Sequence, residues 1–353
     1  MMRVRSGIVL RVGTFTDGVA ELTVMVDGEQ APAIHYETLL GPVQPGDEVL
    51  LNTTAVHLGL GTGGVHFVMG VSGRRHDFDG PGHIMKCRYT PSQVAVLAVE
   101  EPESPYHEVM VDGDLDGTPV IAAGLHSMMA AAAVAARLAA PKARIVYVMT
   151  DGAALPARFS RLVGHLRAEG FLDAVITCGN AFGGDFEAVT LHSGLLAARR
   201  VCHADIILAA MGPGVVGTGT RWGTTAIEQG LIVDAAHVLA GRPVAAPRLS
   251  FADARERHRG ISHHTLTALG RVAAHRCTVA LPSLSGDQHR LVMQQLNESG
   301  ISTRHRIEWH DTWSIISELE RLPFRLTTMG RTPSQDPAPF ASAAAAAAAA
   351  LSA

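Results

Sequence analysis

The sequence predicts an α/β protein: a mostly parallel sheet with helices on both faces, preceded by a small N-terminal β-barrel-like domain. Residues 1–73 carry short strand-like runs separated by turn dipeptides such as Asp17-Gly18 and Asp27-Gly28. From residue 74 onward, short apolar runs alternate with stretches of helical periodicity, which is typical of a parallel sheet with crossover helices. The length of 353 residues and the 47% hydrophobic content suit two domains with sizeable cores.

The N-terminal domain is predicted to contain five short strands. They are expected at residues 4–12, 19–26, 33–37, 48–52 and 65–71, and Pro45-Gly46-Asp47 forms a tight turn into the fourth. Five short strands in this length predict an SH3-like or OB-like barrel. Because no face combines basic and aromatic residues, we expect a structural or docking role rather than oligonucleotide binding.

The second predicted domain, residues 74–330, contains six apolar strands and six helices. The strands are expected at residues 93–99, 119–123, 143–149, 174–178, 205–210 and 277–281. The helices are expected at residues 128–138, 157–169, 187–201, 224–239, 265–274 and 287–299. Ligands of such sheets bind at the carboxyl ends of the strands, so the loops there are the predicted location of a pocket.

The last segment, residues 331–353, contains three prolines and an alanine run from Ala343 to Ala350. Its low complexity predicts a disordered extension outside the core.

Composition and the pattern of apolar and cysteine residues argue against several kinds of binding partner and cellular location. The chain has 29 Lys and Arg against 33 Asp and Glu, for a formal charge of -4, and only 5% aromatic residues. Nucleic acid and anionic membrane surfaces are therefore disfavoured. The N-terminus has no secretory apolar region and no stretch suits a transmembrane span, so a cytoplasmic location is expected. Four widely spaced cysteines without a C-x-x-C pair argue against a zinc ribbon or a disulfide scaffold.

A glycine-rich segment, Gly212-Pro213-Gly214-Val215-Val216-Gly217, follows the strand predicted at residues 205–210. It cannot be a P-loop, because Thr218-Gly219 replaces the required Lys and Ser/Thr. One interpretation is a dinucleotide loop, with Asp234 about twenty residues on as the ribose-binding carboxylate. A second is a nest of backbone amides that binds an anion together with Thr218 and Arg221. A third assigns the glycines to close packing alone.

Residues 248–264 form the densest polar segment of the chain. Arg255 and Arg257 can clamp a carboxylate or phosphate bidentately, while Asp253, His258 and His263 can transfer protons. The alternative is a solvated loop whose arginines pair with neighbouring acidic residues.

Two further residues stand out by position or rarity. Asp151 directly follows the strand at residues 143–149, which places a carboxylate at the carboxyl edge of the sheet. Lys86 is one of only two lysines, the other being Lys142. A retained compact amine suits an anion site or a titratable nucleophile, although chance survival on the surface is the competing explanation.

The 18 histidines raise the question of a metal. No H-E-x-x-H pair is present, so a site would have to be assembled from separate elements. The candidate ligands are His192, His263 and Asp253, with Asp151 and His258 as further possibilities.

Five segments together resemble the bacterial domain of unknown function 3866 family. They are residues 82–91 (GHIMKCRYTP), 150–156 (TDGAALP), 181–188 (AFGGDFEA), 212–223 (GPGVVGTGTRWG) and 250–264 (SFADARERHRGISHH). The resemblance covers nearly all of the chain except the alanine-rich tail. It implies one shared architecture, and it carries no catalytic role over to any residue.

The sequence therefore predicts a pocket for a small anionic molecule at the strand ends of the α/β domain. The expected ligand-binding residues are Lys86, Gly212, Gly214, Gly217, Thr218, Arg221, Arg255 and Arg257, and the expected catalytic residues are Asp151, Asp253, His258 and His263. The main hypothesis is an enzyme of unassigned reaction. The alternatives are a non-catalytic sensor or adaptor and a dinucleotide-dependent oxidoreductase. The sequence assigns no cofactor and leaves the oligomeric state open.

Overall fold

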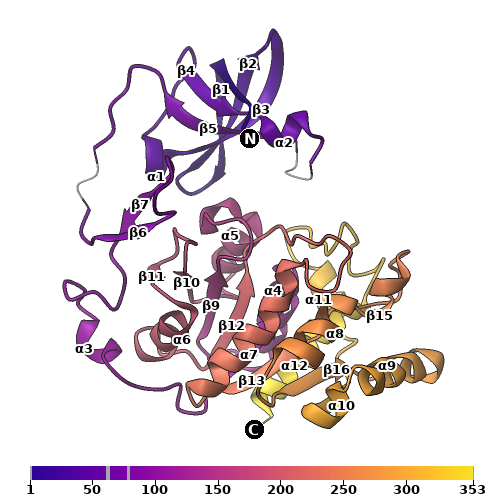
Figure 1. Cartoon of the computed structure of the whole chain (residues 1–353). Coiled ribbons are helices and arrows are strands. Elements are labelled where there is room, and N and C mark those ends of the chain that lie inside the picture. The colour runs from indigo at the N-terminus through magenta and orange to yellow at the C-terminus, as the bar shows by residue number, and fades with distance from the viewer. Residues whose placement is uncertain (1, 61–63, 78–79, 353) are drawn as a thin grey trace. The chain divides into compact units, whose positions relative to one another are not determined.

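The computed structural model describes residues 2–60, 64–77 and 80–352, and the chain divides into two compact units (Figure 1). The first unit comprises residues 1–95 and 158–161, and the second comprises residues 96–157 and 162–353.

The first unit is built on a closed five-stranded barrel, which confirms the predicted barrel-like domain. Its strands are β1 (Val4–Thr16), β2 (Val19–Val26), β3 (Glu29–Tyr36), β4 (Glu48–Asn52) and β5 (His66–Val71), in the order β1-β2-β3-β5-β4. The short helices α1 (Glu37–Leu40) and α2 (Thr54–His57) connect them. Apolar residues that alternate along the strands, such as Leu22 and Val24, fill the barrel interior.

The segment predicted as a strand at residues 93–99 contributes no strand to the large sheet. Its residues Val94–Val96 form β7, which pairs with β6 (Ile84–Lys86) in a separate two-stranded sheet, and Ala98 makes a single parallel bridge to Glu187 of the large sheet. Beyond β7 the chain turns, because the Ala98 N–H donates to the Glu101 carboxylate at 2.6 Å. The helix α3 (His107–Met110) follows.

The second unit contains an eight-stranded, fully parallel sheet, which confirms the predicted α/β class. Its strands are β8 (Pro119–Ala123), β9 (Ile145–Thr150), β10 (Ala174–Cys178), β11 (Phe186–Ala188), β12 (Ile206–Met211), β13 (Arg242–Ala246), β16 (Thr278–Pro282) and β17 (Arg306–His310). Across the sheet they run β11-β10-β9-β12-β8-β13-β16-β17. The sequence did not predict β11, β13 and β17. Because residues 186–188 are a strand, the helix predicted from residue 187 begins only at Leu191.

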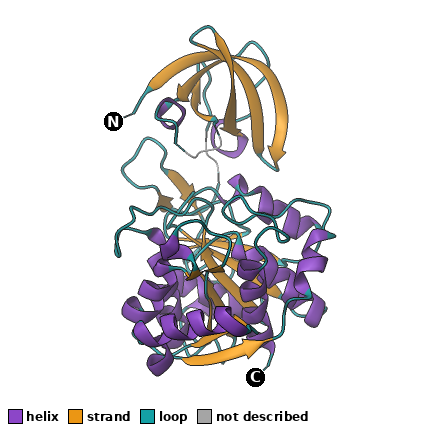
Figure 2. Ribbon diagram, turned by 90° about the vertical axis from the view of Figure 1, so that its right-hand side faces the viewer, coloured by secondary structure: helices purple, strands orange, loops and turns teal. Residues whose placement is uncertain are grey.

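Helices cover both faces of this sheet (Figure 2). Along β9, Ile145, Tyr147 and Met149 belong to one core while Val146 and Val148 belong to the other, as the alternation of a pleated strand requires. The first core includes α4 (Met128–Ala139), α5 (Arg161–Ala168), α11 (Ile315–Glu320) and α12 (Ala338–Leu351). The second includes α6 (Leu191–Arg200), α7 (Glu228–Val238), α9 (Gly286–Glu298) and α10 (Ile301–Arg304).

The prediction of a disordered tail is wrong. Residues 338–351 form α12, whose alanines are almost all buried against α4 and against the strands β8, β13 and β16. Alanine has the highest helix propensity, and its small side chain lets helix and sheet approach closely. Arg242 secures the end of this helix, because its guanidinium donates to the carbonyl of Ala350 at 2.7 Å.

The strand order creates a crevice near the middle of the sheet. The chain passes from β12 to β13, and β8 lies between these two strands. Loops that leave the carboxyl ends of β12 and β13 therefore lie on either side of the end of β8, and ligands commonly bind at such places. None of the helices within the described residues combines the length and the hydropathy that a transmembrane span requires.

Candidate functional site

A small cavity lies where the loops after β12 and β13 meet. It has a volume of about 140 Å³ and is lined by Val215, Gly217, Gly219, Arg248, Arg255, Arg257, His258, His264 and Met329. The glycine-rich loop and the polar segment at residues 248–264, which the sequence singled out separately, thus form two walls of one cavity.

The glycine-rich loop folds back on itself beside the cavity. Gly217 and Thr224 form an antiparallel bridge, and the Thr218 N–H donates to the Gly223 carbonyl at 2.8 Å. A β-carbon on Gly217 would lie 3.1 Å from Cε1 of His264, so the absence of a side chain lets the imidazole approach the loop. Gly212 has a packing role, because a β-carbon there would collide with the carbonyl oxygen of Ala154.

A hairpin presents the arginines and one histidine. The strands β14 (Leu249–Ser250) and β15 (Gly260–Ile261) pair antiparallel, and the short helix η3 (Glu256–His258) lies in the loop between them. The helix α8 (His263–Thr267) follows and continues as the π-helical turn η4 (Ala268–Val272). Ser262 caps α8, since its side chain accepts a hydrogen bond from the His264 N–H. This cap fixes where His263 and His264 leave the helix.

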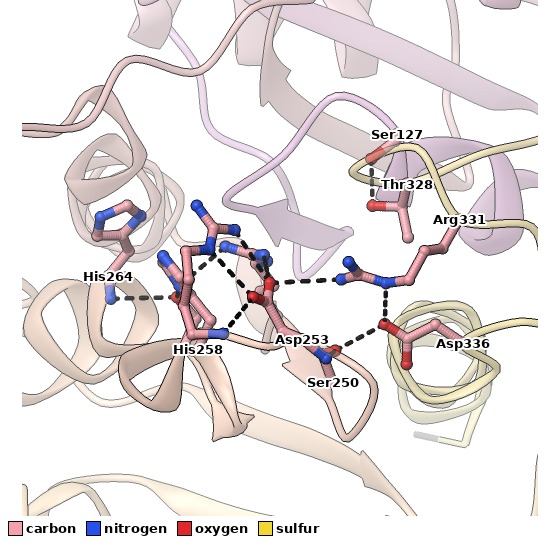
Figure 3. Close-up of polar contacts among 11 residues, drawn as sticks. Ser127, Ser250, Asp253, His258, His264, Thr328, Arg331 and Asp336 are labelled. Atoms are coloured by element: carbon pink, nitrogen blue, oxygen red, sulfur yellow. Dashed lines mark hydrogen bonds and ion pairs between the residues drawn. The ribbon is translucent and has the colours of Figure 1, made fainter. Parts of the chain in front are cut away.

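A buried ion network lies behind the cavity wall, with Asp253 at its centre (Figure 3). The Asp253 carboxylate accepts hydrogen bonds from Arg248 at 2.9 Å, Arg255 at 3.0 Å and Arg331 at 3.3 Å. Arg331 also donates to Asp336 at 3.0 Å, and Asp336 accepts a 2.6 Å hydrogen bond from Ser250. The network therefore ties the hairpin to the segment that precedes α12.

Charge and burial set the protonation of this network. Hydrogen bonds from Arg255 hold the pKa of Asp253 well below its ordinary value, despite the opposing effect of burial. Burial lowers the pKa of Arg248 to about 10, so its guanidinium remains charged at neutral pH. Asp253 and Arg248 are thus both charged at neutral pH.

The segment that carries Met329 is anchored by two hydrogen bonds. The hydroxyls of Ser127 and Thr328 lie 2.8 Å apart (Figure 3), and the Thr328 N–H donates to the Arg331 carbonyl at 2.9 Å. Ser127 lies at the start of α4. The contact therefore joins the start of α4 to the turn that lines the cavity.

Three histidines form a compact cluster at one side of the cavity. The ring centroids of His258, His263 and His264 lie between 4.1 and 5.1 Å apart. Burial, followed by the charges of Arg248 and Arg255, lowers the pKa of His258 to about 3. Burial, followed by His263 and Arg248, lowers the pKa of His264 to about 4, and burial with nearby arginines also lowers that of His263. All three imidazoles are therefore neutral at neutral pH.

The structure brings together part of the predicted set. Gly217, Arg255, Arg257 and His258 line the cavity. His263 lies in the histidine cluster, and Asp253 holds the arginines from behind. Gly212, Gly214, Thr218 and Arg221 belong to the same loop and are not among the described lining residues. The Thr218 hydroxyl is engaged within the loop, 2.9 Å from that of Thr220.

Other predicted residues lie elsewhere. Asp151 accepts hydrogen bonds from the backbone and side-chain amides of Asn180 at 3.0 and 3.2 Å, and so holds the turn after β10. His192 is exposed on α6. Lys86 belongs to the first unit and is buried at the end of β6, and its predicted anion contact stays a prediction. Asp234 lies within α7, where its carboxylate accepts hydrogen bonds from Ala274 and His275.

Several residues of the site were not predicted. Arg248 and His264 lay inside the polar segment without an assigned role, and the run of basic and histidine residues there was the available signal. Arg331, Asp336 and Met329 lay in or next to the tail that was set aside as disordered. Their separation from Asp253 by about eighty residues leaves no local pattern to detect.

The comparisons with known proteins place the chain in a family. The model of the family described as "Protein of unknown function (DUF3866)" matches residues 32–347, which include the barrel from β3 onward, both walls of the cavity and most of α12. No curated protein matches the sequence. Since this match extends over most of the 353 residues, the chain belongs to the DUF3866 family.

Proposed function

We propose that the cavity binds a small anion bearing a carboxylate or phosphate group. The observation that carries this proposal is the convergence of three arginines, Arg248, Arg255 and Arg257, on one cavity of about 140 Å³. The cavity is small, so it suits a group with a handful of heavy atoms rather than a large ligand.

The charge balance around the cavity favours an anion. Arg248 and Arg255 share a single carboxylate, that of Asp253. Arg257 forms no ion pair within the part of the chain that the structure describes, and it is exposed at the cavity edge. Guanidinium groups bind carboxylate and phosphate oxygens through paired hydrogen bonds. An incoming anion would therefore complete the pairing that Asp253 leaves incomplete.

An enzyme and a non-catalytic sensor would use this same cavity, and a turnover assay on each compound that binds distinguishes them. The dinucleotide-dependent oxidoreductase ranks behind both. Asp234, the proposed ribose ligand, lies inside α7 and is bonded to residues 274–275. A dinucleotide is also much larger than the cavity.

The proposal is tested by calorimetric titration of the full chain with inorganic phosphate and with small carboxylates at low ionic strength. The variant Arg257→Gln removes an exposed lining charge that makes no ion pair or side-chain hydrogen bond within the described residues. A charge-assisted hydrogen bond contributes about 1.5–3 kcal/mol, so the affinity should fall by roughly tenfold to a hundredfold. The matched control, Arg290→Gln, removes an exposed arginine on α9 that pairs with Asp287 and should leave the affinity unchanged.

Two results would overturn the proposal. One is the absence of binding to the wild-type chain for phosphate and every carboxylate tested at millimolar concentration. The other is an equal affinity in Arg257→Gln and Arg290→Gln, which would place any observed binding outside the cavity.

A further inference from the structure

The histidine cluster is packed in a way that hydrogen bonding alone does not explain. Nε2 of His263 is buried and has no hydrogen-bond partner among the described residues. An unpaired buried imidazole nitrogen is costly and calls for a partner such as a water molecule or an ion. His258 and His264 each place a ring nitrogen within 4.8 Å of that of His263.

We propose that His258, His263 and His264 bind a divalent transition metal of the zinc class. Imidazole nitrogens are borderline ligands that suit Zn²⁺ and its neighbours, and a three-histidine site leaves one coordination position open. All three histidines come from one seven-residue segment whose ends are fixed by the β14–β15 hairpin and by the Ser262 cap. The cluster is therefore built by local structure and does not depend on distant side chains meeting.

The imidazole nitrogens need to move only slightly closer together to bind one metal ion. Zinc–nitrogen bonds of about 2.1 Å in a tetrahedral site put ligand nitrogens about 3.4 Å apart. Since the nitrogens in the cluster lie within 4.8 Å of one another, they need to approach by no more than about 1.4 Å. Rotation of the imidazole rings about their side-chain bonds covers this distance.

The surroundings supply partners that orient two of the rings. Nδ1 of His258 lies 2.8 Å from the Ser262 hydroxyl, and Nδ1 of His264 lies 3.4 Å from that of Thr224. In metal sites the second ring nitrogen donates to such an oxygen, which fixes the tautomer and the ring orientation. Arg248 also donates to Nδ1 of His258 at 3.0 Å. If His258 binds the metal through Nε2, its proton moves to Nδ1. Arg248 then loses its hydrogen bond to Nδ1 but keeps its ion pair with Asp253.

The arginines affect how the metal would be held. A divalent cation beside Arg248, Arg255 and Arg257 experiences repulsion that the single carboxylate of Asp253 does not balance. An anion in the open coordination position would offset this charge while contacting the arginines. This part of the inference rests on the proposed anion-binding function, whereas the three-histidine ligation does not.

The test is a titration of the metal-free full chain with Zn²⁺ and with Co²⁺ in a non-coordinating buffer at neutral pH. We expect one equivalent to bind and the Co²⁺ form to show the intense visible absorption of a four-coordinate site. The variant His263→Gln should lower the affinity by at least about a hundredfold, since a change in a supporting residue alone costs up to that much. The control His192→Gln removes an exposed histidine on α6 and should not change the affinity.

A folding defect in His263→Gln is recognised from the far-ultraviolet circular dichroism of the metal-free variant. The wild-type Co²⁺ spectrum gives an answer that is independent of any variant. A wild-type chain that binds no metal at micromolar concentration, or that shows only the weak spectrum of six-coordinate Co²⁺, overturns the proposal. Equal affinities in His263→Gln and wild type do the same.

Adding inorganic phosphate separates the two proposals. Phosphate that binds the metal-free chain supports anion binding whatever the metal result. If the chain binds metal but phosphate binds neither the metal-free nor the metal-bound chain, the histidine site is supported and the anion-binding proposal is refuted. If phosphate occupies the open coordination position, it changes the Co²⁺ spectrum, and an unchanged spectrum at saturating phosphate refutes this part of the inference.

Discussion

Replacing Asp253 with asparagine tests the ion network on which the cavity is built. The side chains of Asp253 and Arg248 are only 3% and 6% exposed, so the substitution leaves a buried guanidinium without its carboxylate. Removing one partner of a buried pair costs about 3–5 kcal/mol. Asparagine keeps one oxygen acceptor and Arg331 keeps Asp336, so we expect the lower end, about 3 kcal/mol.

The free energy of unfolding can be measured by urea titration with tryptophan fluorescence. All three tryptophans, Trp222, Trp309 and Trp313, belong to the second unit, so the signal reports the unit that contains the network. The control Asp116→Asn breaks an exposed pair with Arg199, in which Asp116 is 76% exposed. Exposed pairs contribute at most about 1 kcal/mol, so the free energy of unfolding of this variant should be close to that of the wild type.

The pH dependence provides a second signature of Asp253. Its pKa is lower in the folded chain than in the unfolded chain, so the unfolded chain binds the proton first as pH falls. The stabilisation is therefore fully present above the unfolded value of about 3.9 and is lost as pH falls below it. The difference in the free energy of unfolding between Asp253→Asn and the wild type should accordingly decrease below about pH 4. A difference under about 1 kcal/mol at pH 7 would refute the argument that Arg248 depends on this carboxylate.

Three further predictions concern stability. Burial lowers the pKa of His126 to about 4, so the unfolded chain binds a proton first below about pH 6.5. Acidification to pH 4 should therefore cost about 3 kcal/mol through His126 alone, and His126→Gln should reduce the slope of the unfolding free energy against pH by that share in urea titrations; an unchanged slope contradicts the assignment. Phe340 in α12 is only 2% exposed, so Phe340→Ala should lower the free energy of unfolding by about 3–5 kcal/mol. A loss below about 1 kcal/mol would mean that α12 does not pack against the sheet. Gly164→Ala meets no atom within 4 Å and should raise the thermal midpoint through helix propensity. Gly230→Ala should lower the midpoint, because its β-carbon would lie 2.6 Å from the Ala268 carbonyl oxygen, and equal shifts would contradict this.

The predictable part of the fold is the part encoded in continuous apolar runs. The strands β8, β9, β10, β12 and β16 are such runs, buried on both faces, and they were found within about two residues of their ends. β13 contains Pro243 and two alanines, and β17 is a polar edge strand. Neither has the apolar β-branched pattern that single-sequence reasoning uses. Pairing with neighbouring strands makes them extended, and that information is not local.

The alanine-rich helix α12 was missed for a different reason. A run of alanines is compatible with a solvated tail and with a tightly packed helix, because alanine carries little hydrophobic area of its own. The decision depends on whether a matching surface exists. Here α4, which is itself rich in alanine, offers that surface, and the match is visible only in three dimensions.

The site shows the same division between local and distant information. Gly217 was predicted because its loop follows a strand of the parallel sheet, and Arg255, Arg257 and His258 were predicted because they lie in the densest polar segment of the chain. Asp151 obeys that rule as well, yet it is used to bind the turn at Asn180. Position at a strand end thus selects candidates, and only the contacts distinguish a ligand-binding residue from one that holds a neighbouring loop.

The C-terminal segment connects these observations, because it is part of the scaffold of the cavity. Asp336 lies just before α12 and accepts hydrogen bonds from Ser250 in β14 and from Arg331, which in turn contacts Asp253. Within α12, the Ser342 hydroxyl donates to the Pro247 carbonyl at 2.7 Å, next to Arg248. The helix and the residue Asp336 before it therefore hold the start of the arginine-bearing segment, where the chain leaves β13. A segment that composition alone would set aside thus determines where the three arginines converge.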